Sequence, residues 1–352
     1  MLLDTENLRD RVRTVIATYL DQQREVLEEV SDDCAPLVDY VADLMTGGKR
    51  LRAAFCYWGW RAAGAPDRPG IVTAAAACEF LQAAALIHDD VMDDSDTRRG
   101  APAVHRRFAA LHGPGPGAGH FGISAAVLAG DLCLTWSDAL YTGSGLDPAA
   151  LARGRRVFDR MRIQLMGGQY LDLLDQARGG RHRDPVERAR RVVHYKSAKY
   201  TVEHPLLLGG LLAGAGDDLL DGLSAYGLPL GEAFQLRDDV LGVFGDPART
   251  GKPAGDDLRE GKRTVLIALA CERADDVREK VLNDLLGHPE LDLSGIATLR
   301  EIITDTGALA ATERMISRLL ERSLAALHAT GLDDPGRSVL LALAEAATDR
   351  VA

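Results

Sequence analysis

The sequence of 352 residues is poor in several features that mark other classes of protein. Aromatic residues make up 5% of the chain, and no segment alternates apolar and polar side chains as a half-buried strand does. The five cysteines are scattered, without the C-x-x-C spacing of zinc or redox sites. An odd number of such thiols favours reduced core residues. These absences argue against a β-sheet protein, a zinc protein and a disulfide-bonded secreted protein.

Long apolar runs are also absent. No uninterrupted apolar stretch is long enough to span a membrane, and the N-terminal segment has no apolar signal-peptide core. The formal net charge of −11 argues against nucleic acid or an anionic membrane as a general partner. It does not exclude a phosphorylated substrate, because local cations and metal ions decide that question. We therefore expect a soluble, cytoplasmic protein without stable membrane insertion.

Hydrophobic residues make up 46% of the chain, with alanine and leucine dominant, which favours helices. Helical spacing recurs between Gly, Pro and Asp boundaries, so we predict an all-α fold with residues 1–352 as a single domain. Two segments rich in glycine, proline or charge, His112–Gly122 and Asp246–Gly261, are predicted to be long loops. The predicted helices are Asn7–Val30, Leu37–Met45, Leu51–Ala63, Ile71–Asp93, Val104–Leu111, Ile123–Tyr141, Pro148–Gln176, Pro185–Leu212, Asp217–Val243, Thr264–Arg273, Asp276–Leu286, Ile296–Thr304, Leu309–Ala329 and Pro335–Ala352.

The stretch Leu86–Gly100, LIHDDVMDDSDTRRG, ends an apolar, alanine-rich helix with acidic residues. Asp89 and Asp93 are four residues apart and stack on one helix face, while Asp90 projects to the side. Like charges at this spacing repel, and they face the negative end of the helix dipole. A divalent cation such as Mg²⁺ would turn this repulsion into binding. For one such cluster alone, a solvated acidic turn remains the alternative.

A second acidic pair, Asp238 and Asp239, ends another apolar helix in Phe234–Asp246, FQLRDDVLGVFGD. Two such motifs could face each other across a bundle core and hold metal ions with a diphosphate between them. Phosphate oxygens also need cationic donors. Basic residues lie near both motifs and near the chain start: Lys49, Arg50, Arg52, Arg98, Arg99, Lys252 and Lys262.

These motifs, in this order over roughly Thr46–Thr264, resemble the trans-isoprenyl diphosphate synthases, the family of farnesyl and geranylgeranyl diphosphate synthases. The resemblance implies a large helical bundle with a central active-site cavity and a homodimer. It also implies chain elongation by addition of isopentenyl diphosphate to an allylic diphosphate. Such sites hold a cluster of about three Mg²⁺ ions.

The resemblance also implies residue roles, motif by motif. GGKRLR (Gly47–Arg52) resembles the family's G-K-x-x-R element, and MGGQYLD resembles G-Q-x-x-D, which places Asp172 near the metal cluster. The implied metal ligands are Asp89, Asp93 and Asp238, with Asp90 orienting them. The residues implied at the diphosphate of isopentenyl diphosphate are Lys49, Arg52, Gln82 and Arg99. Those implied at the allylic substrate are Arg98, Gln169, Lys196, Ser197, Gln235, Lys252 and Lys262. The implied catalytic set is Asp89, Asp93, Arg98, Lys196, Asp238 and Lys252.

One departure from the family pattern concerns the second motif, which is usually DDxxD. Here the fifth position is Gly242, so that position supplies no carboxylate. The first aspartate carries most of the metal ligation in the family, and Asp238 is present. Asp246 is a candidate substitute for the missing side chain. The family's usual Lys-Thr pair is also Lys196-Ser197 here, which retains the hydroxyl.

The helix preceding Asp89 is implied to line the tunnel for the growing chain. In the family, bulky aromatics at the positions of Ala84 and Ala85 close the pocket at a C15 product. Both are small here, so we expect geranylgeranyl diphosphate (C20), with Leu81 or Phe80 as the tunnel floor. A farnesyl or a longer (C25 and above) product is the alternative. Alanines that merely permit close helix packing are the simpler interpretation of Ala84 and Ala85.

Two rival functions share parts of this pattern. A class I terpene cyclase also has DDxxD in a helical fold, but it lacks an isopentenyl site, and Gly47–Arg52 with Arg99 argues against it. A non-catalytic partner subunit typically loses aspartates from the first motif, which is intact here. No Ser-His-Asp or Cys-His arrangement is evident. His88 and His194, beside the motifs, are expected to serve the core or helix caps rather than catalysis.

Overall fold

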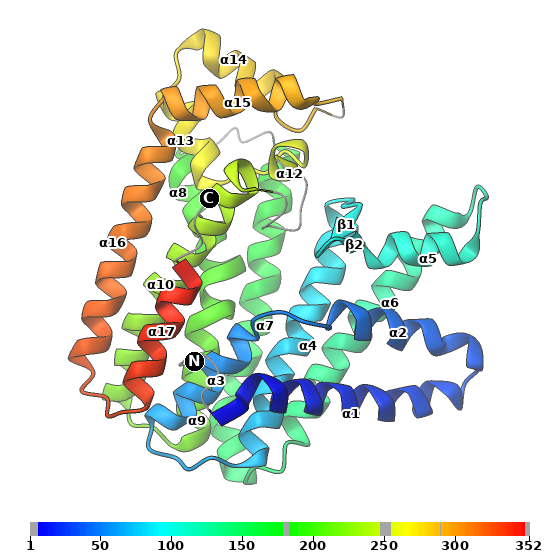
Figure 1. Cartoon of the computed structure of the whole chain (residues 1–352), viewed down its shortest axis with the longest axis vertical. Coiled ribbons are helices and arrows are strands. Elements are labelled where there is room, and N and C mark those ends of the chain that lie inside the picture. The colour runs from blue at the N-terminus through cyan, green and yellow to red at the C-terminus, as the bar shows by residue number, and fades with distance from the viewer. Residues whose placement is uncertain (1–5, 179–182, 247–254, 289, 349–352) are drawn as a thin grey trace. The chain divides into compact units, whose positions relative to one another are not determined.

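The computed structural model describes residues 6–178, 183–246, 255–288 and 290–348 (Figure 1). These residues are overwhelmingly helical, which confirms the predicted all-α class. The chain divides into two compact units. Unit 1 comprises Met1–Arg156 with Leu208–Ala215, and unit 2 comprises Val157–Leu207 with Gly216–Ala352.

Unit 1 is organised around α4, which packs against α1, α3 and α6. Alanine dominates the buried face of α4, and a methyl side chain lets neighbouring helices approach while losing no rotamer entropy. Ser137 Oγ of α6 donates to Ala77 O of α4 at 2.7 Å. The elements of unit 1 that precede α7 are α1 (Leu8–Glu28), the 3-10 helix η2 (Asp32–Cys34), α2 (Ala35–Leu44), α3 (Leu51–Ala62), α4 (Pro69–Met92), β1 (Thr97–Arg98), β2 (Ala101–Pro102), α5 (Val104–His112) and α6 (Ala118–Thr142).

Two described helices, α4 and α6, are long and apolar enough to cross a membrane by length and composition alone. The apolar window of α4 is 78% buried within the protein, as in the core helix of a soluble protein. The corresponding window of α6 is only 33% buried. The apolar character of α4 is therefore explained by core packing, whereas α6 retains an apolar face.

The predicted loop His112–Gly122 is wrong in its second half, because α6 already begins at Ala118. That prediction rests on glycine, which favours irregular backbone. A Cβ on Gly122 would overlap His105 O of α5 and lie 2.9 Å from Ala109 Cβ. Gly122 thus serves close packing of α6 on α5, which outweighs its low helix propensity.

A short hairpin follows α4. Strands β1 and β2 pair antiparallel, with Arg98 opposite Ala101. The two-residue loop between them, Arg99 and Gly100, has positive φ at both positions (56° and 77°), as a type I′ turn requires. A search for helical or strand periodicity misses an element of this length. The hairpin fixes the backbone that carries Arg98 and Arg99.

Unit 2 contains most of α7 and the elements that follow it, except that α9 is divided and its residues from Leu208 onward belong to unit 1. Its long helix α10 packs against η3 and α16. Buried hydroxyls join its helices: Ser323 Oγ donates to Tyr226 O at 2.8 Å, and Tyr226 Oη donates to Leu340 O at 2.7 Å. The elements are α7 (Pro148–Ala177), α8 (Pro185–Val192), the π-helix η3 (Val193–Glu203), α9 (His204–Ala213), α10 (Asp217–Phe244), α12 (Asp256–Arg259), α13 (Val265–Arg273), α14 (Asp276–Leu285), α15 (Leu293–Asp305), α16 (Ala308–Ala329) and α17 (Gly336–Thr348).

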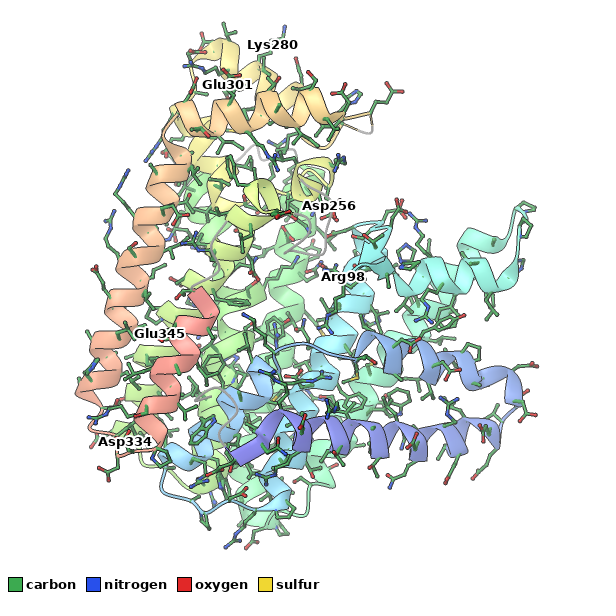
Figure 2. The ribbon with its side chains drawn as sticks, in the orientation of Figure 1. Arg98, Asp256, Lys280, Glu301, Asp334 and Glu345 are labelled. Atoms are coloured by element: carbon green, nitrogen blue, oxygen red, sulfur yellow. The ribbon has the colours of Figure 1, made fainter. Side chains whose placement is uncertain are left out.

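The outer surface of unit 2 is charged, as expected of helices with one face in water. Lys280 on α14, Glu301 on α15 and Glu345 on α17 are exposed (Figure 2). Within the unit, Arg237 of α10 donates to both carboxylate oxygens of Glu313 of α16, at 2.6 and 2.7 Å. This bidentate pair ties together two of the helices that form the unit's core.

The segment predicted as one helix, Pro185–Leu212, consists of α8, η3 and α9 in succession. The middle part, η3, is wound as a π-helix, a rare form that is frequent at functional sites. Two glycines let other helices approach it. A Cβ on Gly231 of α10 would lie 2.6 Å from Ala198 O, and one on Gly168 of α7 would overlap Lys196 N. The π-helix is therefore held closely between α7 and α10.

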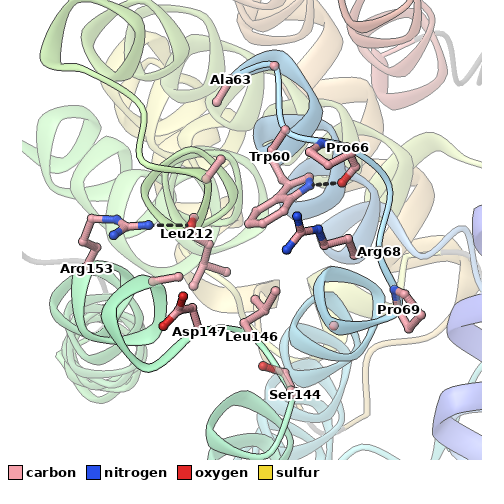
Figure 3. Close-up of a pocket in the computed structure, with 16 residues that line it drawn as sticks. Trp60, Ala63, Pro66, Arg68, Pro69, Ser144, Leu146, Asp147, Arg153 and Leu212 are labelled. Atoms are coloured by element: carbon pink, nitrogen blue, oxygen red, sulfur yellow. Dashed lines mark hydrogen bonds between the residues drawn. The ribbon is translucent and has the colours of Figure 1, made fainter.

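A surface hollow of about 720 Å³ lies in unit 1 at the N-terminal end of α4 (Figure 3). Trp60, Arg68, Leu146 and Arg153 contribute to its wall. Arg153 is itself engaged, because its guanidinium donates to the carbonyls of Leu211 and Leu212 at 3.0 Å. None of the predicted substrate residues that the structure describes lines this hollow. The first aspartate motif lies at the opposite end of α4, roughly 36 Å along a helix of this length.

Candidate active site

The first aspartate motif forms the C-terminal end of α4. Asp89 and Asp90 lie in its last turn, and Asp93 is the C-cap, whose N–H donates to Asp89 O at 2.8 Å. Asp89 and Asp93 are half-buried, whereas Asp90 is 0% exposed. The carboxylate oxygens of Asp93 are themselves buried, so the last turn presents Asp89 as its more accessible carboxylate, with Asp90 and Asp93 enclosed.

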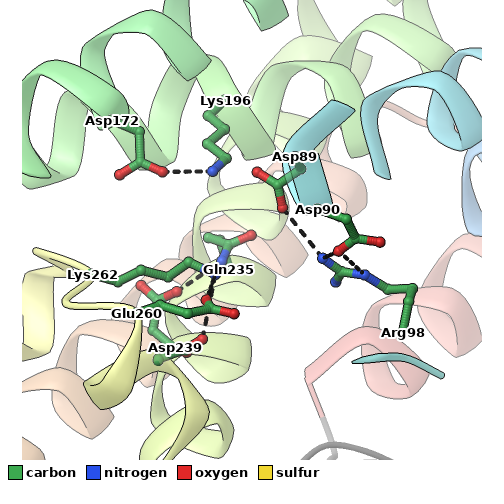
Figure 4. A network of polar contacts seen from close by, with 10 residues as sticks. Asp89, Asp90, Arg98, Asp172, Lys196, Gln235, Asp239, Glu260 and Lys262 are labelled. Carbon is green, nitrogen blue, oxygen red and sulfur yellow. Dashed lines mark hydrogen bonds and ion pairs between the residues drawn. The ribbon is translucent and has the colours of Figure 1, made fainter. Parts of the chain in front are cut away.

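Arg98 of the hairpin holds the enclosed carboxylate (Figure 4). Its Nε donates to Asp90 Oδ1 at 2.8 Å, and its Nη2 contacts both Asp90 Oδ1 and Asp89 Oδ2, the latter at 3.5 Å. A buried carboxylate requires such a partner. The expectation that Asp90 orients the motif fits this geometry. The arginine that the resemblance assigns to the allylic diphosphate is already tied to the motif.

The loop before α3 carries the basic GGKRLR element. Gly47, Gly48 and Arg50 all have positive φ, at 78°, 89° and 53°. Arg50 is buried, and it donates to Glu79 Oε2 of α4 at 3.3 Å and to Met45 O. Glu79 Oε1 also accepts from Ala53 N at 3.1 Å, in the first turn of α3. One buried glutamate therefore fixes the loop and the start of α3 to the helix that bears the aspartates.

Arg99 lies against this loop. Its Nη1 donates to Leu44 O at 2.8 Å, and its Nη2 would lie 3.5 Å from a Cβ on Gly48. Burial lowers the pKa of the Arg99 guanidinium, and the neighbouring charges of Arg50, Arg52 and Arg98 lower it further. The charge of Glu79 acts in the opposite direction on this pKa. A bound anion such as a diphosphate would offset the remaining repulsion among the arginines.

The other residues assigned to this substrate lie on the same elements. Lys49 belongs to the loop and is exposed, Arg52 lies in the first turn of α3, and Gln82 is half-buried on α4. Unit 1 thus gathers Lys49, Arg52, Arg98 and Arg99 around the segments joined by Glu79. Sequence reasoning missed Arg50 and Glu79 as structural supports. A buried acid and a buried base far apart in sequence give no local signal of their pairing.

In unit 2, the G-Q-x-x-D motif of α7 meets the π-helix. Lys196 Nζ donates to Asp172 Oδ2 at 2.6 Å, and both side chains are largely buried (Figure 4). Ser197 follows Lys196 and is 7% exposed, while Gln169 is half-buried on α7. The paired carboxylate holds the ammonium in one position, which prepares it for a second anion.

The second aspartate motif lies near the C-terminal end of α10. Asp239 is buried and accepts from Gln235 Nε2 at 2.8 Å, while Asp238 is half-buried. Burial raises the pKa of Asp239 to about 8, with further contributions from Asp257, Asp238 and Asp172. The hydrogen bond from Gln235 lowers the pKa of Asp239 and so opposes these effects. Several carboxylates therefore converge here, an arrangement that a cation would stabilise.

Asp257 of α12 and Glu260, which follows the helix, are two acidic side chains that sequence reasoning did not assign. Lys262 Nζ pairs with Glu260 and lies 3.6 Å from Asp257 Oδ1. The segment GKPAGDDLREGK carries a local signal for them, because acidic residues alternate there with the lysines assigned to the allylic substrate. Lys252, in the same segment, lies outside the described residues.

The described side chains can supply only some of the oxygen ligands that a Mg²⁺ ion needs. No group of three or more His, Cys, Asp or Glu side chains among the described residues is arranged to hold a metal ion. Mg²⁺ sites in phosphoryl enzymes usually use one or two carboxylates, with water and substrate phosphates completing the octahedron. Asp89 and Asp93 in unit 1 and Asp238 in unit 2 are carboxylates of that kind.

The residues expected to set product length lie on α4. Ala85 is half-buried on the face that also carries Gln82 and Asp89, whereas Ala84 and Leu81 are each 1% exposed. Phe80 is fully buried and packs edge-on against Tyr19 and Trp136. Phe80 and Leu81 are thus both part of the core of unit 1. Leu81 is the one that lies a full turn from Ala85 on the same helix face.

The two histidines beside the motifs have structural partners. His88 Nε2 lies 3.3 Å from Val127 O of α6, where Gly130 leaves room for the ring. His194 Nδ1 lies 2.9 Å from Glu232 Oε1. Both contacts fit the expected structural role.

Comparison with known proteins gives consistent matches. The family model described as Polyprenyl synthetase matches residues 35–303. A solved geranylgeranyl pyrophosphate synthase from Corynebacterium glutamicum, complexed with isoprenyl diphosphate and magnesium, superposes with a TM-score of 0.93 at 41% identity, covering 98% of this chain and 99% of that one. A geranylgeranyl diphosphate synthase from Methanosarcina mazei is 30% identical over 310 residues, 87% of this chain and 86% of the relative.

Another relative has a product of different length in its name. Nonaprenyl diphosphate synthase from Mycobacterium tuberculosis is 31% identical over 345 residues, 97% of this chain and 91% of that protein. The comparisons therefore agree on the kind of protein but not on one product. The match over residues 35–303 shows that this chain belongs to the polyprenyl synthetase family.

Proposed function

We propose that this protein is a Mg²⁺-dependent trans-prenyltransferase that joins isopentenyl diphosphate to an allylic diphosphate, with geranylgeranyl diphosphate (C20) as its main product. Family membership supports the reaction class. The observation that carries the assignment is the cationic cluster of Arg50, Arg52, Arg98 and Arg99 beside Asp89 in unit 1. It supports an anion site next to carboxylates suited to a metal ion. A class I terpene cyclase binds no isopentenyl diphosphate and therefore lacks a second diphosphate site of this kind.

Each polar residue has a proposed role. Lys49, Arg52, Gln82 and Arg99 bind the diphosphate of isopentenyl diphosphate. Arg98, Lys196, Lys252 and Lys262 neutralise the allylic diphosphate, and Asp89, Asp93 and Asp238 hold Mg²⁺. When bound, Mg²⁺ stabilises the negative charge that develops on the leaving diphosphate.

The remaining chemistry needs no protein nucleophile. Departure of the diphosphate leaves an allylic cation, which the dipoles of Gln169, Gln235 and the Ser197 hydroxyl stabilise without attacking it. The double bond of isopentenyl diphosphate adds to the cation, and loss of a proton from the adduct forms the new double bond. The released diphosphate accepts that proton. His88 and His194 have no part in this scheme.

The small side chain of Ala85 supports a product longer than C15. It shares a helix face with Asp89, so the growing chain would pass it on its way from the metal site. We propose Leu81, one turn further, as the floor. Ala84 is buried, so its contribution is to let a neighbouring element approach. A farnesyl product or a product of C25 and above is the alternative.

We also propose a cytoplasmic homodimer in which both units act as one synthase domain. The apolar face of α6 supports the dimer. Phe121, Ile123, Val127 and Leu128 are each 40% exposed or more, which is unusual for side chains of this size facing water. A second copy of the chain is the proposed occupant of this face.

The decisive experiment incubates purified protein with isopentenyl diphosphate and, separately, dimethylallyl, geranyl and farnesyl diphosphate. Products are dephosphorylated and their lengths measured by chromatography, with and without Mg²⁺. We expect C20 from every primer and no product in EDTA. Formation of cyclic hydrocarbons without isopentenyl diphosphate would favour the cyclase. A complete lack of product from all primers would favour the non-catalytic subunit.

A further inference from the structure

The hollow at the N-terminal end of α4 has no part in the proposed reaction. Its wall is built from the ends of α3 and α9, the starts of α4 and α7, and the segments that precede those two starts. All of its lining residues belong to unit 1. The volume of about 720 Å³ lies within the range of small-molecule sites, and most of the lining is apolar or glycine, as in such sites (Figure 3).

Hydrogen bonds hold the walls of the hollow in place. Trp60 Nε1 donates to Pro66 O at 2.8 Å, and Arg11 of α1 pairs with Asp67 at 2.8 Å, so the segment before α4 is fixed at two points. On the opposite side, the Arg153 guanidinium donates to two carbonyls at the end of α9 at 3.0 Å (Figure 3). A preformed hollow loses little conformational freedom when it binds a molecule.

Two polar side chains of the wall lack partners within the described part of the chain. Ser144 is 6% exposed, and its hydroxyl oxygen is buried without a hydrogen bond there. Burying a hydroxyl in this state costs free energy, which a bound polar group would recover. The Arg68 guanidinium also makes no hydrogen bond or ion pair with the described residues, and it points into the hollow between Trp60 and Leu146 (Figure 3).

The charges in the wall favour an anion with a single negative charge. Arg68 and Arg153 against the exposed carboxylate of Asp147 leave a net charge of +1, in a chain whose formal net charge is −11. The planar guanidinium of Arg68 matches a carboxylate through two parallel hydrogen bonds. Asp147 disfavours a head group with more negative charge, such as a phosphate monoester. Trp60 and Leu146 add apolar surface for a hydrocarbon body.

We propose that the hollow binds a small hydroxylated carboxylate, which has one carboxylate and one hydroxyl on a hydrocarbon body. Arg68 binds the carboxylate, Trp60 and Leu146 pack against the body, and Ser144 bonds to the hydroxyl. The hollow shares no described lining residue with the proposed diphosphate sites, so this inference stands independently of the proposed reaction.

The test is isothermal titration of the full-length protein with ω-hydroxydecanoate in EDTA, which keeps Mg²⁺ from the proposed reaction site. We expect Arg68→Met to weaken binding about ten- to a hundredfold, the range for one charge-assisted contact. Arg156→Met is the matched control, because Arg156 is exposed on α7 outside the hollow, and it should bind as wild type does. Equal affinity of wild type and Arg68→Met overturns the proposal.

Ligands that lack one group test each contact. Decanoate lacks the hydroxyl, and it should bind wild type about two- to tenfold more weakly, the scale of one neutral hydrogen bond. Ser144→Ala should abolish this difference, because it removes the partner of the hydroxyl. A difference that persists in Ser144→Ala overturns the assignment of the hydroxyl. Decanediol lacks the carboxylate, and it should bind wild type and Arg68→Met equally weakly.

Three further measurements separate the alternatives. Ala213→Phe places a ring in the hollow and should abolish binding, with thermal unfolding by circular dichroism to establish that the variant is folded. Retained binding in folded Ala213→Phe places the ligand elsewhere and overturns the proposal. Loss of binding in Lys196→Met, with Arg68→Met unaffected, assigns the ligand to the proposed reaction site and also overturns it. Tighter binding of decyl phosphate than of decanoate overturns the choice of a carboxylate.

Discussion

The three aspartates of the first motif are the same residue type but sit in different surroundings. Asp90 is enclosed and paired with Arg98, while Asp89 and Asp93 are half-buried residues at the end of α4, and the carboxylate oxygens of Asp93 are buried. A buried carboxylate with a charged partner is suited to holding its neighbours in place. The carboxylates of Asp89 and Asp93 repel each other across one helical turn, and a bound cation would offset this repulsion.

Asp89→Asn and Asp93→Asn are therefore each expected to lower kcat by about 10²–10³, the scale for loss of one electrostatic stabiliser of a transition state. Steady-state elongation assays at saturating Mg²⁺ measure this. Asp96→Asn is a matched control, because Asp96 is exposed and paired with Arg106. Its activity should stay near wild type. Undiminished turnover of the wild-type enzyme in EDTA contradicts the metal assignment.

The two diphosphate sites should separate on mutation. Lys49→Ala and Arg52→Ala are expected to raise KM for isopentenyl diphosphate, and Lys252→Ala to raise KM for the allylic primer. Each charge-assisted contact contributes roughly 1.5–3 kcal/mol, or about ten- to a hundredfold in affinity. Kinetics with each substrate varied in turn measure the split. Equal changes in both KM values for every variant would refute the assignment of two sites.

His204 gives a prediction about acid stability. It is 2% exposed, and burial lowers its pKa to about 4, outweighing the opposing effect of Glu203. The unfolded chain binds this proton more tightly, so the stabilisation is complete above the ordinary histidine pKa and is lost as the pH falls toward 4. Wild type should lose about 2 kcal/mol of unfolding free energy between about pH 7 and about pH 5 from this residue.

Urea unfolding at the two pH values measures that loss. His204→Gln should be less stable than wild type near neutral pH but should show a smaller loss on acidification. His120→Gln, a substitution at an exposed position of α6, should retain the full pH dependence of wild type. An unchanged pH dependence in His204→Gln would show that other groups titrate.

At the scale of elements, α4 links several functions along one helix. Glu79 joins it to α3 and the basic loop, Ala85 and Leu81 follow within two turns, and the aspartates end it. The regular rise of a helix sets the distance between the proposed floor at Leu81 and the proposed metal ligand Asp89. A change of one turn in the blocking residue should therefore change the product by a discrete number of isoprene units.

Ala85→Phe is accordingly expected to shift the main product from C20 to C15, because a ring at this position would block the path one turn from Asp89. Ala84→Phe is expected to act mainly on folding, since its site is filled. Overpacking of a filled site costs roughly 1–3 kcal/mol. Product chromatography and thermal melts distinguish the two effects. Unchanged C20 release by a folded Ala85→Phe variant would place the floor elsewhere.

At the scale of the whole molecule, the incompletely covered face of α6 is the feature to explain. Leu128 is 57% exposed on a helix whose apolar window is 33% buried. A charge placed in a dimer interface is costly to desolvate. Leu128→Glu is therefore expected to shift the protein from dimer toward monomer in light scattering with size-exclusion chromatography.

Leu111→Glu is the matched control, because Leu111 is similarly exposed (55%) but lies on α5. It should leave the oligomeric state unchanged. A wild-type protein that is monomeric at assay concentration, yet active, would contradict the dimer proposal directly.

The sequence by itself determined the helical class and most helix positions, and it predicts the chemistry of the site. Apolar spacing is local, and so are the aspartate and lysine motifs, so they can be identified before any folding is known. Its largest error was the loop His112–Gly122, because glycine has the same local signature in a turn and in a close helix contact. Only packing distinguishes the two.

The tertiary structure decided what depends on contacts between distant residues. The pairing of Arg50 with Glu79, the enclosure of Asp90 by Arg98 and the π-helix around Lys196 have no local signature. The same holds for Gly242. The sequence shows only that this position lacks the family's aspartate. The structure shows that the Asp257 side chain lies where a side chain at position 242 would begin. Burial and charge proximity assign these residues their roles, and both arise only when segments far apart in the chain come together.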